Sequence, residues 1–336
     1  MVAHLTRALL LSAILIASCE KKEPPPAQGP ASPPGAPTRI AVVPKGTTHV
    51  FWKSVEAGAR KAEKELGVQV TFRGPEREDD REQQVSLVQN LVSSKYSAIV
   101  LAPLDDKALV GPVKQATAVN IPVVIIDSGL QAKAGEDFVS FVATDNEHGG
   151  HMAGERMSLI LGGKGTVLLL RYQEGSASTT LREKGFVDAL GKSPGITLID
   201  PKRYAGATRA SAQEAADNLL LANPKIDGVF CPNESSTFGM LLALRSKGLA
   251  GKVKFVGFDA SDAAVEAMRK GEVDSLVLQN PIHMGYMGVK TAVEYLRTGK
   301  ALERVDTGVV IVTRDNMDTP DSQNLLAPDL KALLGP

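Results

Sequence analysis

Cysteine and aromatic residues are scarce in this chain, and neither sign of charge is in excess. The 336 residues include two cysteines, Cys19 and Cys231, and one tryptophan, Trp52, and aromatic residues make up 4%. Two cysteines exclude a fold held together by several disulfides, and Cys231, after the apolar Val229-Phe230, is expected to be a buried inert thiol. Lys and Arg number 38, as do Asp and Glu, so no basic excess indicates a nucleic-acid partner.

Motifs for catalysis and for phosphate binding are also missing. The glycine-rich segment 161–165 lacks the P-loop pattern, and no G-x-G-x-x-G follows the first apolar run. No nucleophile-elbow motif occurs. His148 and His151 are three residues apart, but no further cluster of ligands lies nearby in sequence, so a solvated helix start is the favoured interpretation. We therefore predict no catalytic residue, no metal and no cofactor.

A short apolar run stands at the N-terminus. Residues 8–17 are almost wholly apolar and follow the basic Arg7, which is typical of a signal peptide and too short for a stable membrane-spanning helix. The run ends in Ile16-Ala17-Ser18-Cys19, which resembles the lipobox of bacterial lipoproteins. The resemblance implies cleavage after residue 18 and a diacylglycerol on the Cys19 sulfur, hence a membrane-anchored protein of the periplasm or cell-envelope face. An ordinary signal peptide that happens to contain a cysteine is the alternative.

Proline is concentrated in the segment that follows. Residues 23–38 contain seven prolines, a composition that favours extended polyproline II and cannot bury a core. At about 3.1 Å per residue, such a segment reaches roughly 50 Å. We predict that residues 19–38 form a tether between the membrane anchor and the folded part.

From Arg39 onward, short apolar runs alternate with amphipathic helical patterns. The runs at 40–43, 98–101 and 121–126 contain no polar alternation, as expected for strands of a parallel sheet that is buried on both faces. The alternation continues through a second half of similar construction, with a last apolar run at 309–312. The predicted fold class is α/β, with two doubly wound parallel-sheet lobes.

The first strand, loop and helix unit, residues 40–67, carries several candidate binding residues. Its loop leaves the carboxyl end of the strand, where open α/β sheets bind their ligands. The loop and the start of the helix bear Lys45, His49, Phe51 and Trp52. An aromatic pair beside a cation suits a polar ligand with an apolar face, whereas simple packing of Phe51 and Trp52 is the alternative interpretation.

Polar side chains also follow four other apolar runs. They are Asp127, Asn233, Asp259 and Gln279. Carboxylates accept hydrogen bonds and amides both donate and accept them, so a cluster of these groups suits a ligand rich in hydroxyls. Each residue alone could be a helix cap or a turn former.

The chain from Arg39 to about Arg314 resembles the periplasmic sugar-binding proteins of the ribose-binding type. The resemblance is carried by IAVV…FW…GA…A…LG at 40–67, IVLAPLD at 99–105, IPVVIID at 121–127, ATDN…GG…AG at 143–154, REKGF at 182–186, VFCPNE at 229–234 and VGFDAS at 256–261. This family has the type I periplasmic binding protein fold, shared with the ligand-binding half of LacI-type repressors. The resemblance implies two lobes joined by three crossovers: 39–144 plus 280–308, and 145–279 plus 309–314, with 315–336 as a C-terminal tail.

Family ligand contacts map onto twelve positions of this sequence. They are Lys45, His49, Phe51, Trp52, Asp127, Ser128, Thr180, Arg182, Tyr204, Asn233, Asp259 and Gln279. Phe51, Trp52 and Tyr204 would stack on sugar ring faces. Ribose binders have Asn at the His49 position and Arg at the Ser128 and Thr180 positions, with Arg182 the nearest arginine here. Because of these departures, ribose itself is not implied as the ligand.

The resemblance implies a substrate-binding lipoprotein of an ABC importer, without enzymatic activity. Its expected partners are a sugar or polyol-like solute and a membrane permease, and it is expected to be a monomer. A lipid-anchored sensor that presents solute to a signalling receptor is the alternative, while a repressor would need a DNA-binding segment where the lipobox and tether stand. An acidic sugar is a further alternative because three cations, Lys45, Arg171 and Arg182, fall near the predicted cleft. Glu174 and Glu234 lie in the same loops and could neutralise these cations, so a neutral sugar is favoured.

Overall fold

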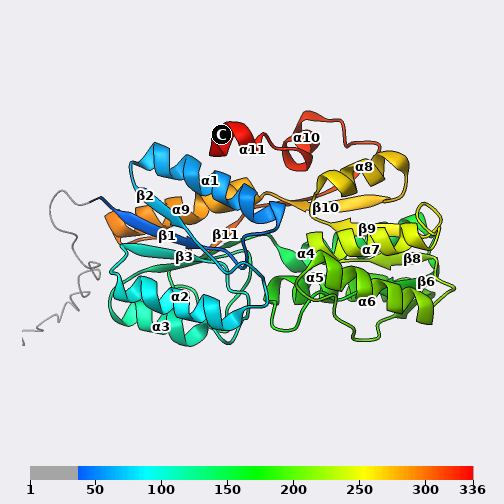
Figure 1. Cartoon of the computed structure of the whole chain (residues 1–336), viewed down its shortest axis with the longest axis horizontal. Coiled ribbons are helices and arrows are strands. Elements are labelled where there is room, and N and C mark those ends of the chain that lie inside the picture. The colour runs from blue at the N-terminus through cyan, green and yellow to red at the C-terminus, as the bar shows by residue number, and fades with distance from the viewer. Residues whose placement is uncertain (1–36, 336) are drawn as a thin grey trace, which may run out of the picture.

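The computed structural model describes residues 37–335, which form two α/β lobes arranged along the long axis of the molecule (Figure 1). Residues 1–36 lie outside the described part, and with them the predicted signal segment, Cys19 and nearly all of the tether. Between residues 37 and 335, no helix is long and apolar enough to cross a membrane.

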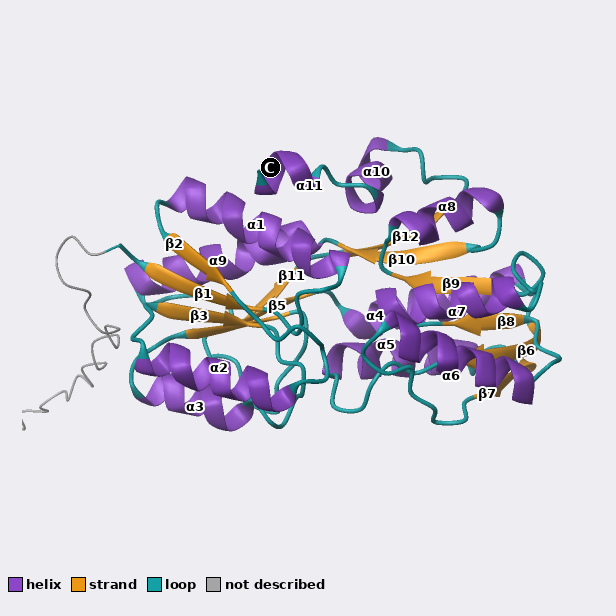
Figure 2. Cartoon of the chain, viewed as in Figure 1, coloured by secondary structure: helices purple, strands orange, loops and turns teal. Residues whose placement is uncertain are grey.

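The first lobe is built on a six-stranded parallel sheet with the order β11-β5-β4-β3-β1-β2. Its strands are β1 (Arg39–Val43), β2 (Gln69–Phe72), β3 (Ala98–Leu101), β4 (Val123–Ile126), β5 (Ser140–Ala143) and β11 (Arg304–Asp306). Helices α1 (Val50–Leu66) and α9 (Pro281–Thr298) cover one face of this sheet, and α2 (Arg81–Ser93) and α3 (Val110–Ala118) cover the other (Figure 2). Ile40 and Val42 of β1 belong to the first core, and Ala41 and Val43 to the second, as strand alternation requires.

The second lobe repeats this arrangement, with the strand order β12-β10-β9-β8-β6-β7. Its strands are β6 (Lys164–Leu169), β7 (Gly195–Ile199), β8 (Gly228–Phe230), β9 (Lys254–Phe258), β10 (Ser275–Gln279) and β12 (Val309–Thr313). Its helices are α4 (Asn146–Ile160), α5 (Ala177–Leu190), α6 (Arg209–Ala222), α7 (Glu234–Ser246) and α8 (Asp262–Lys270). Strand by strand, β1 to β5 of the first lobe correspond to β6 to β10 of the second. The predicted two-lobe α/β fold is confirmed.

The chain passes from one sheet to the other three times, after β5, after β10 and after β11. The helix after β5, α4, packs on α5 of the second lobe, and the helix after β10, α9, packs on α1 of the first. Both pairs are in glycine-mediated contact: a Cβ added at Gly58 would clash with the backbone oxygen of Ile282, and one at Gly150 with that of Arg182. The close packing holds α1 and α5 firmly, and the N-terminal ends of these two helices carry binding-site side chains.

Several elements differ from the sequence-based expectations. Strand β12 is antiparallel to β10, so the second sheet is parallel except at this edge. Strand β11 and helix α8 were not predicted. Helix α5 begins at Ala177, so Ser178 and Thr179 belong to its first turn. Its N-cap, Ser176, makes no side-chain hydrogen bond to the first turn, and the backbone N–H of Ser178 instead donates to Oγ of Ser128, at 3.1 Å.

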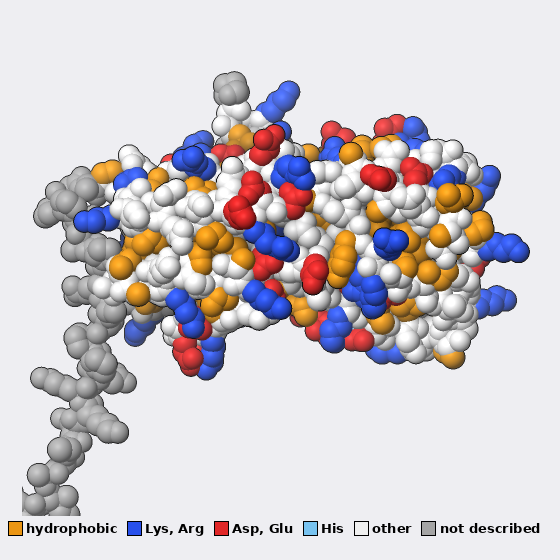
Figure 3. All heavy atoms as spheres, turned by 60° about the horizontal axis from the view of Figure 1, so that its bottom comes forward, with side chains coloured by type: hydrophobic (Ala, Val, Ile, Leu, Met, Phe, Trp, Pro, Cys, Tyr) orange, Lys and Arg blue, Asp and Glu red, His pale blue; other side chains and the backbone are white. Residues whose placement is uncertain are grey.

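The C-terminal segment folds onto both lobes. Helix α10 (Pro320–Leu326) lies against β10 of the second lobe, and α11 (Leu330–Leu334) lies against α1 of the first. The residues between the two helices therefore run from one lobe to the other, on the upper side of the molecule in Figure 1. Acidic and basic side chains are intermingled on the face shown in Figure 3, in keeping with a formal net charge of zero.

Candidate ligand-binding cleft

A polar cavity of about 30 Å³ lies between the lobes, at the carboxyl ends of their strands. Nine of the twelve residues predicted from the sequence line it: Lys45, His49, Phe51, Trp52, Asp127, Arg182, Asn233, Asp259 and Gln279. Five further lining residues were not predicted as ligand contacts: Glu78, Tyr172, Ser178, Thr179 and Glu234. A cavity of this size holds about two water molecules. The side chains of the two lobes therefore fill most of the space between them.

Two aspartates occupy equivalent places in the two lobes. Asp127 follows β4 and Asp259 follows β9, the third strand from the same end of each sheet. Both have a left-handed backbone, with φ of 61° and 64°, and both are nearly buried. Residues other than glycine adopt this conformation at an energetic cost, and functional sites are where such strain is concentrated. The strained turn directs each carboxylate into the cleft.

Lys45 links the two lobes at one end of the cavity. Its Nζ lies 2.9 Å from Oδ2 of Asp127, within the first lobe. It also donates to Oγ of Ser178, at 3.0 Å, and to Oγ of Ser176, at 3.4 Å, at the start of α5 in the second lobe. With 3% of its surface exposed, this lysine is a buried cation whose charge is neutralised by Asp127.

Glu78 is the centre of a second network across the lobes. Its carboxylate accepts hydrogen bonds from Nδ1 of His49 at 2.5 Å and Nε1 of Trp52 at 2.8 Å, both in the first lobe. The hydroxyl of Tyr172, in the second lobe, donates to the same carboxylate at 2.7 Å. Burial opposes ionisation of Glu78, but the charge and hydrogen bond of His49 and the charge of Lys45 outweigh it and lower the pKa of Glu78 to about 2.

The same contacts govern the protonation of His49 and Tyr172. Burial would lower the pKa of His49, but the charge of Glu78 and the hydrogen bond to it raise this pKa above its usual value. Burial, and then the charge of Glu78, raise the pKa of the Tyr172 hydroxyl well above its usual value. Tyr172 therefore stays protonated and acts as a donor, while Glu78 stays ionised and acts as an acceptor.

In the second lobe, Arg182 organises the floor of the cavity. It donates from Nε to Oδ1 of Asn146, at 2.8 Å, and from Nη1 to the backbone oxygen of Pro232, at 3.0 Å. Asp259 lies 3.7 Å away and accepts a 2.7 Å hydrogen bond from Nε2 of Gln279. Burial raises the pKa of Asp259 to about 6, although Arg182 and Gln279 act in the opposite direction.

Asn233 and Glu234 reach the cavity from the start of α7. Asn233 caps this helix, its Oδ1 accepting from the backbone N–H of Ser236 at 3.2 Å. Its amide nitrogen also donates to Oγ of Ser235, at 3.2 Å. Glu234 is paired with Arg209. The alternative interpretation of Asn233 as a helix cap is therefore confirmed, and the same residue also lines the cavity.

Three of the twelve predicted residues lie outside the cavity lining. Ser128 is fully buried, and its Oγ accepts from the backbone N–H of Ser178, at 3.1 Å, across the lobes. Thr180 is exposed on α5, and Tyr204 is 45% exposed. Arg171, one of three cations considered for an acidic ligand, is bound to Glu183 and Asp200 and does not line the cavity.

Several buried polar atoms of the cavity lack a hydrogen-bond partner within the described residues. They are Nη2 of Arg182, Oε2 of Glu234 and Oε1 of Gln279. Leaving such groups unpaired is costly, and natural structures rarely do so without a functional reason. All three atoms come from the second lobe. Ligand hydroxyls can donate to the two oxygens and accept from the arginine.

One group of potential metal ligands lies elsewhere, on α4 and α5. Side-chain atoms of Glu147, His151 and Asp188 lie within 4.8 Å of one another. Nζ of Lys184 already bridges the two carboxylates, at 2.5 and 2.8 Å. A lysine in this position competes with any cation, so the group is best described as a surface ion-pair network.

The residues missed by sequence reasoning had only weak signals. Glu78 stands among charged residues, at 76–82, and no apolar neighbour indicates its burial. A buried indole nevertheless needs an acceptor, and Trp52 finds it in Glu78. Tyr172 and Ser178 fall in the segment after β6, the equivalent of the segment after β1 that carries Lys45. Because the lobes repeat, that correspondence would have indicated both residues.

Comparison with known proteins agrees with this geometry. A family model described as periplasmic binding protein domain matches residues 40–301. The D-allose-binding periplasmic protein of Escherichia coli is 31% identical over 272 residues, which cover 80% of this chain and 87% of that protein.

Two solved structures are similar over most of the chain. One is an ABC transporter solute-binding protein of Agrobacterium vitis with bound D-fucose, at 36% identity and a TM-score of 0.83, covering 86% of this chain and 99% of the other. Another is a carbohydrate transporter solute-binding protein of Agrobacterium radiobacter in complex with D-arabinose, at 36% identity and a TM-score of 0.82, covering 87% and 99%.

Proposed function

This chain belongs to the periplasmic binding protein family, and we propose that it is the lipid-anchored sugar-binding component of an ABC importer. Its solute is a neutral monosaccharide or a derivative of one, held between two closing lobes. The observation that carries the proposal is the cluster of three unpaired buried atoms, from Arg182, Glu234 and Gln279, in a cavity lined by both lobes. Similar proteins that are described with D-allose, D-fucose and D-arabinose support a sugar as the solute class.

The balance of charge in the cavity favours a neutral solute. Four carboxylates line it, those of Glu78, Asp127, Glu234 and Asp259. The permanent cations of the lining are Lys45 and Arg182, and each already lies next to an aspartate. An acidic sugar would add a negative charge where carboxylates outnumber cations, whereas neutral hydroxyls can bond to both kinds of group.

Binding of a sugar requires the lobes to separate first. The cavity of about 30 Å³ is much smaller than a pyranose ring, and Lys45 and Tyr172 hold its walls together across the lobes. A solute that contacts both lobes favours the closed arrangement in proportion to its higher affinity for that arrangement. Those polar contacts between the lobes that the solute does not displace then help to hold them closed around it.

A thermal-shift screen tests the proposal directly. The probes are D-allose, D-ribose, D-arabinose, D-fucose, polyols, sugar acids and sugar phosphates, with calorimetry on each hit. We expect neutral sugars to give the largest shifts. Replacement of Asp127 by Asn removes a charged acceptor and should weaken binding by about 1.5–3 kcal/mol. The control Asp217→Asn, at a half-buried position of α6 outside the cavity lining, should leave the affinity unchanged.

Two results would count against this function. No shift with any sugar or polyol would refute sugar binding, and a best ligand among the acids or phosphates would refute the neutral class. Equal loss of affinity in Asp127→Asn and Asp217→Asn would mean that the cavity is not the binding site.

The proposed membrane anchor rests on the lipobox-like sequence at residues 16–19 and on the proline-rich segment after it. A tethered binding protein stays near its permease, which raises its effective concentration there. The lipid would hold the folded part at the periplasmic or cell-envelope face of a membrane, as a monomer.

A further inference from the structure

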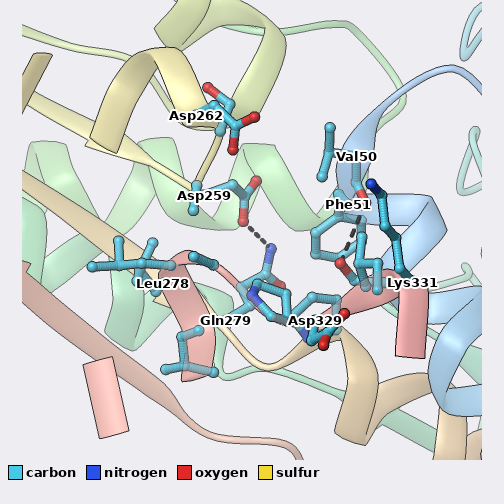
Figure 4. Close-up of a pocket in the computed structure, with 17 residues that line it drawn as sticks. Val50, Phe51, Asp259, Asp262, Leu278, Gln279, Asp329 and Lys331 are labelled. Carbon is cyan, nitrogen blue, oxygen red and sulfur yellow. Dashed lines mark hydrogen bonds between the residues drawn. The ribbon is translucent and has the colours of Figure 1, made fainter. Parts of the chain in front are cut away.

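A second and larger cavity lies beside the cleft, beneath the C-terminal segment. It has a volume of about 370 Å³, and we call it the side chamber. Its inner wall is formed by the start of α1, by the ends of β9 and β10 and by the turn into α8, and its outer wall by residues 325–331. Figure 4 shows Val50 and Phe51 on one side and the hydrogen-bonded Asp259 and Gln279 on the other.

The side chamber and the cleft share part of their lining. Phe51, Asp259 and Gln279 belong to both cavities. Gln279 uses its amide nitrogen to bond Asp259, and its Oε1 is left without a partner. These three side chains are therefore the partition between the two spaces. A substituent on a sugar bound in the cleft would reach the side chamber by displacing only side-chain atoms.

The walls of the side chamber are mainly apolar, although four buried polar residues also line it: Ser54, Asp259, Ser261 and Gln279. Val50, Phe51, Leu278 and Pro281 line it from the lobes, and Leu325, Leu326, Pro328 and Leu330 line it from the C-terminal segment. Asp262, Asp329 and Lys331 are exposed. Mainly apolar walls with a few buried polar groups, in the size range of small-molecule sites, suit an apolar group better than a second sugar ring.

We propose that the side chamber is the aglycone compartment of the binding site. The chain then takes a glycoside, whose sugar ring lies in the cleft and whose aromatic or alkyl aglycone lies against Phe51 and under residues 325–331. This inference rests on the proposed sugar-binding function. It gives the C-terminal segment, which crosses from one lobe to the other, a direct part in ligand selection.

Calorimetry with paired probes tests this inference on the full chain. The probes are D-fucose, D-arabinose and D-allose, each beside its methyl and 4-nitrophenyl glycosides in both anomeric forms. At least one 4-nitrophenyl glycoside should bind at least about tenfold more tightly than its parent sugar, since burial of an aromatic ring can supply that gain. The methyl glycoside should show a smaller gain.

Substitutions that fill the side chamber provide the decisive comparison. Ala327→Trp fills it from the C-terminal segment, and Val50→Trp fills it from α1. Both should abolish the preference for the aryl glycoside while the parent sugar still binds. The matched control is Ala332→Trp, an exposed position on α11 outside the chamber lining, which should keep the preference. Because the ratio of the two affinities is measured in one variant, partial unfolding does not alter it.

The outcomes separate this inference from the function on which it rests. If parent sugars bind and aryl glycosides bind no more tightly, the side chamber is not an aglycone site, although sugar binding stands. If disaccharides of the same sugars are preferred over aryl glycosides, the compartment recognises a hydroxylated ring and the apolar assignment is wrong. If neither sugars nor glycosides bind, sugar binding itself is refuted.

Discussion

The hydrogen bond from Tyr172 to Glu78 joins the lobes, so its removal should lower the affinity for the ligand. The donor and acceptor oxygens are 2.7 Å apart, and both side chains are nearly buried. The pKa of Glu78 is lowered to about 2, so at neutral pH the acceptor is an ionised carboxylate. Hydrogen bonds to charged groups contribute about 1.5–3 kcal/mol net of competition with water.

Tyr172→Phe removes this bond and keeps the aromatic ring in the cavity. Because the bond exists only when the lobes are together, its loss lowers the stability of the closed state relative to the open state. We expect the sugar affinity to fall by about 10- to 150-fold, the equivalent of that free energy. Calorimetry gives the affinity, and the fluorescence of Trp52, which donates to the same carboxylate, gives the dissociation rate, which should rise.

The matched control is Tyr96→Phe. The Tyr96 hydroxyl donates to Oγ1 of Thr71 at 3.1 Å, and both residues belong to the first lobe. This variant should alter stability slightly and leave the affinity unchanged. If Tyr172→Phe binds sugar as tightly as the natural chain, or if both variants lose affinity equally, the bond to Glu78 does not contribute to closure.

Four further predictions concern pH, packing, anchoring and closure. Burial raises the pKa of Asp259 to about 6. The neutral carboxyl group therefore stabilises the folded protein fully at low pH, and this stabilisation is lost as the pH rises through 6. From pH 4 to 7, the natural chain should therefore lose about 1–3 kcal/mol of unfolding free energy relative to Asp259→Asn, by denaturant titration. Gly150→Ala should destabilise the protein by more than about 2 kcal/mol because the added methyl group meets the backbone of Arg182. The control Gly111→Ala, with open space around it in α3, should stabilise the protein by about 0.5–1 kcal/mol. Equal effects of the two substitutions in thermal unfolding would contradict the packing argument. Cys19→Ser should move the protein from the membrane fraction to the supernatant or block its processing, and natural protein already found in the supernatant would refute lipidation. Small-angle scattering should show a smaller radius of gyration at saturating sugar, and an unchanged radius would contradict closure.

Strand-helix alternation predicted most of the fold because buried parallel strands leave a strong signal. Runs such as β3 and β4 are apolar at every position and are buried at every position. β11 left a weak signal because it is short and partly exposed. Helix α8, in contrast, is marked by the capping Ser261 and by Gly271 at its end, and these signals were overlooked. The course of residues 315–335 depends on contacts with both lobes, which no local pattern encodes.

For the binding site, the sequence indicated which residues meet but not how they pair. The carboxyl ends of parallel strands must converge, and for that reason Asp127, Asp259 and Gln279 were identifiable. Partners are set by geometry between lobes: Lys45 was considered as a contact for an acidic ligand, yet its charge is taken up by Asp127. Glu78 stands among charged residues in the sequence, yet it is buried and accepts hydrogen bonds from three donors. A buried carboxylate is tolerable when several donors satisfy it, and those of Glu78 come from both lobes. Because the lobes meet only in the folded, closed arrangement, no single stretch of sequence shows that Glu78 belongs to the site.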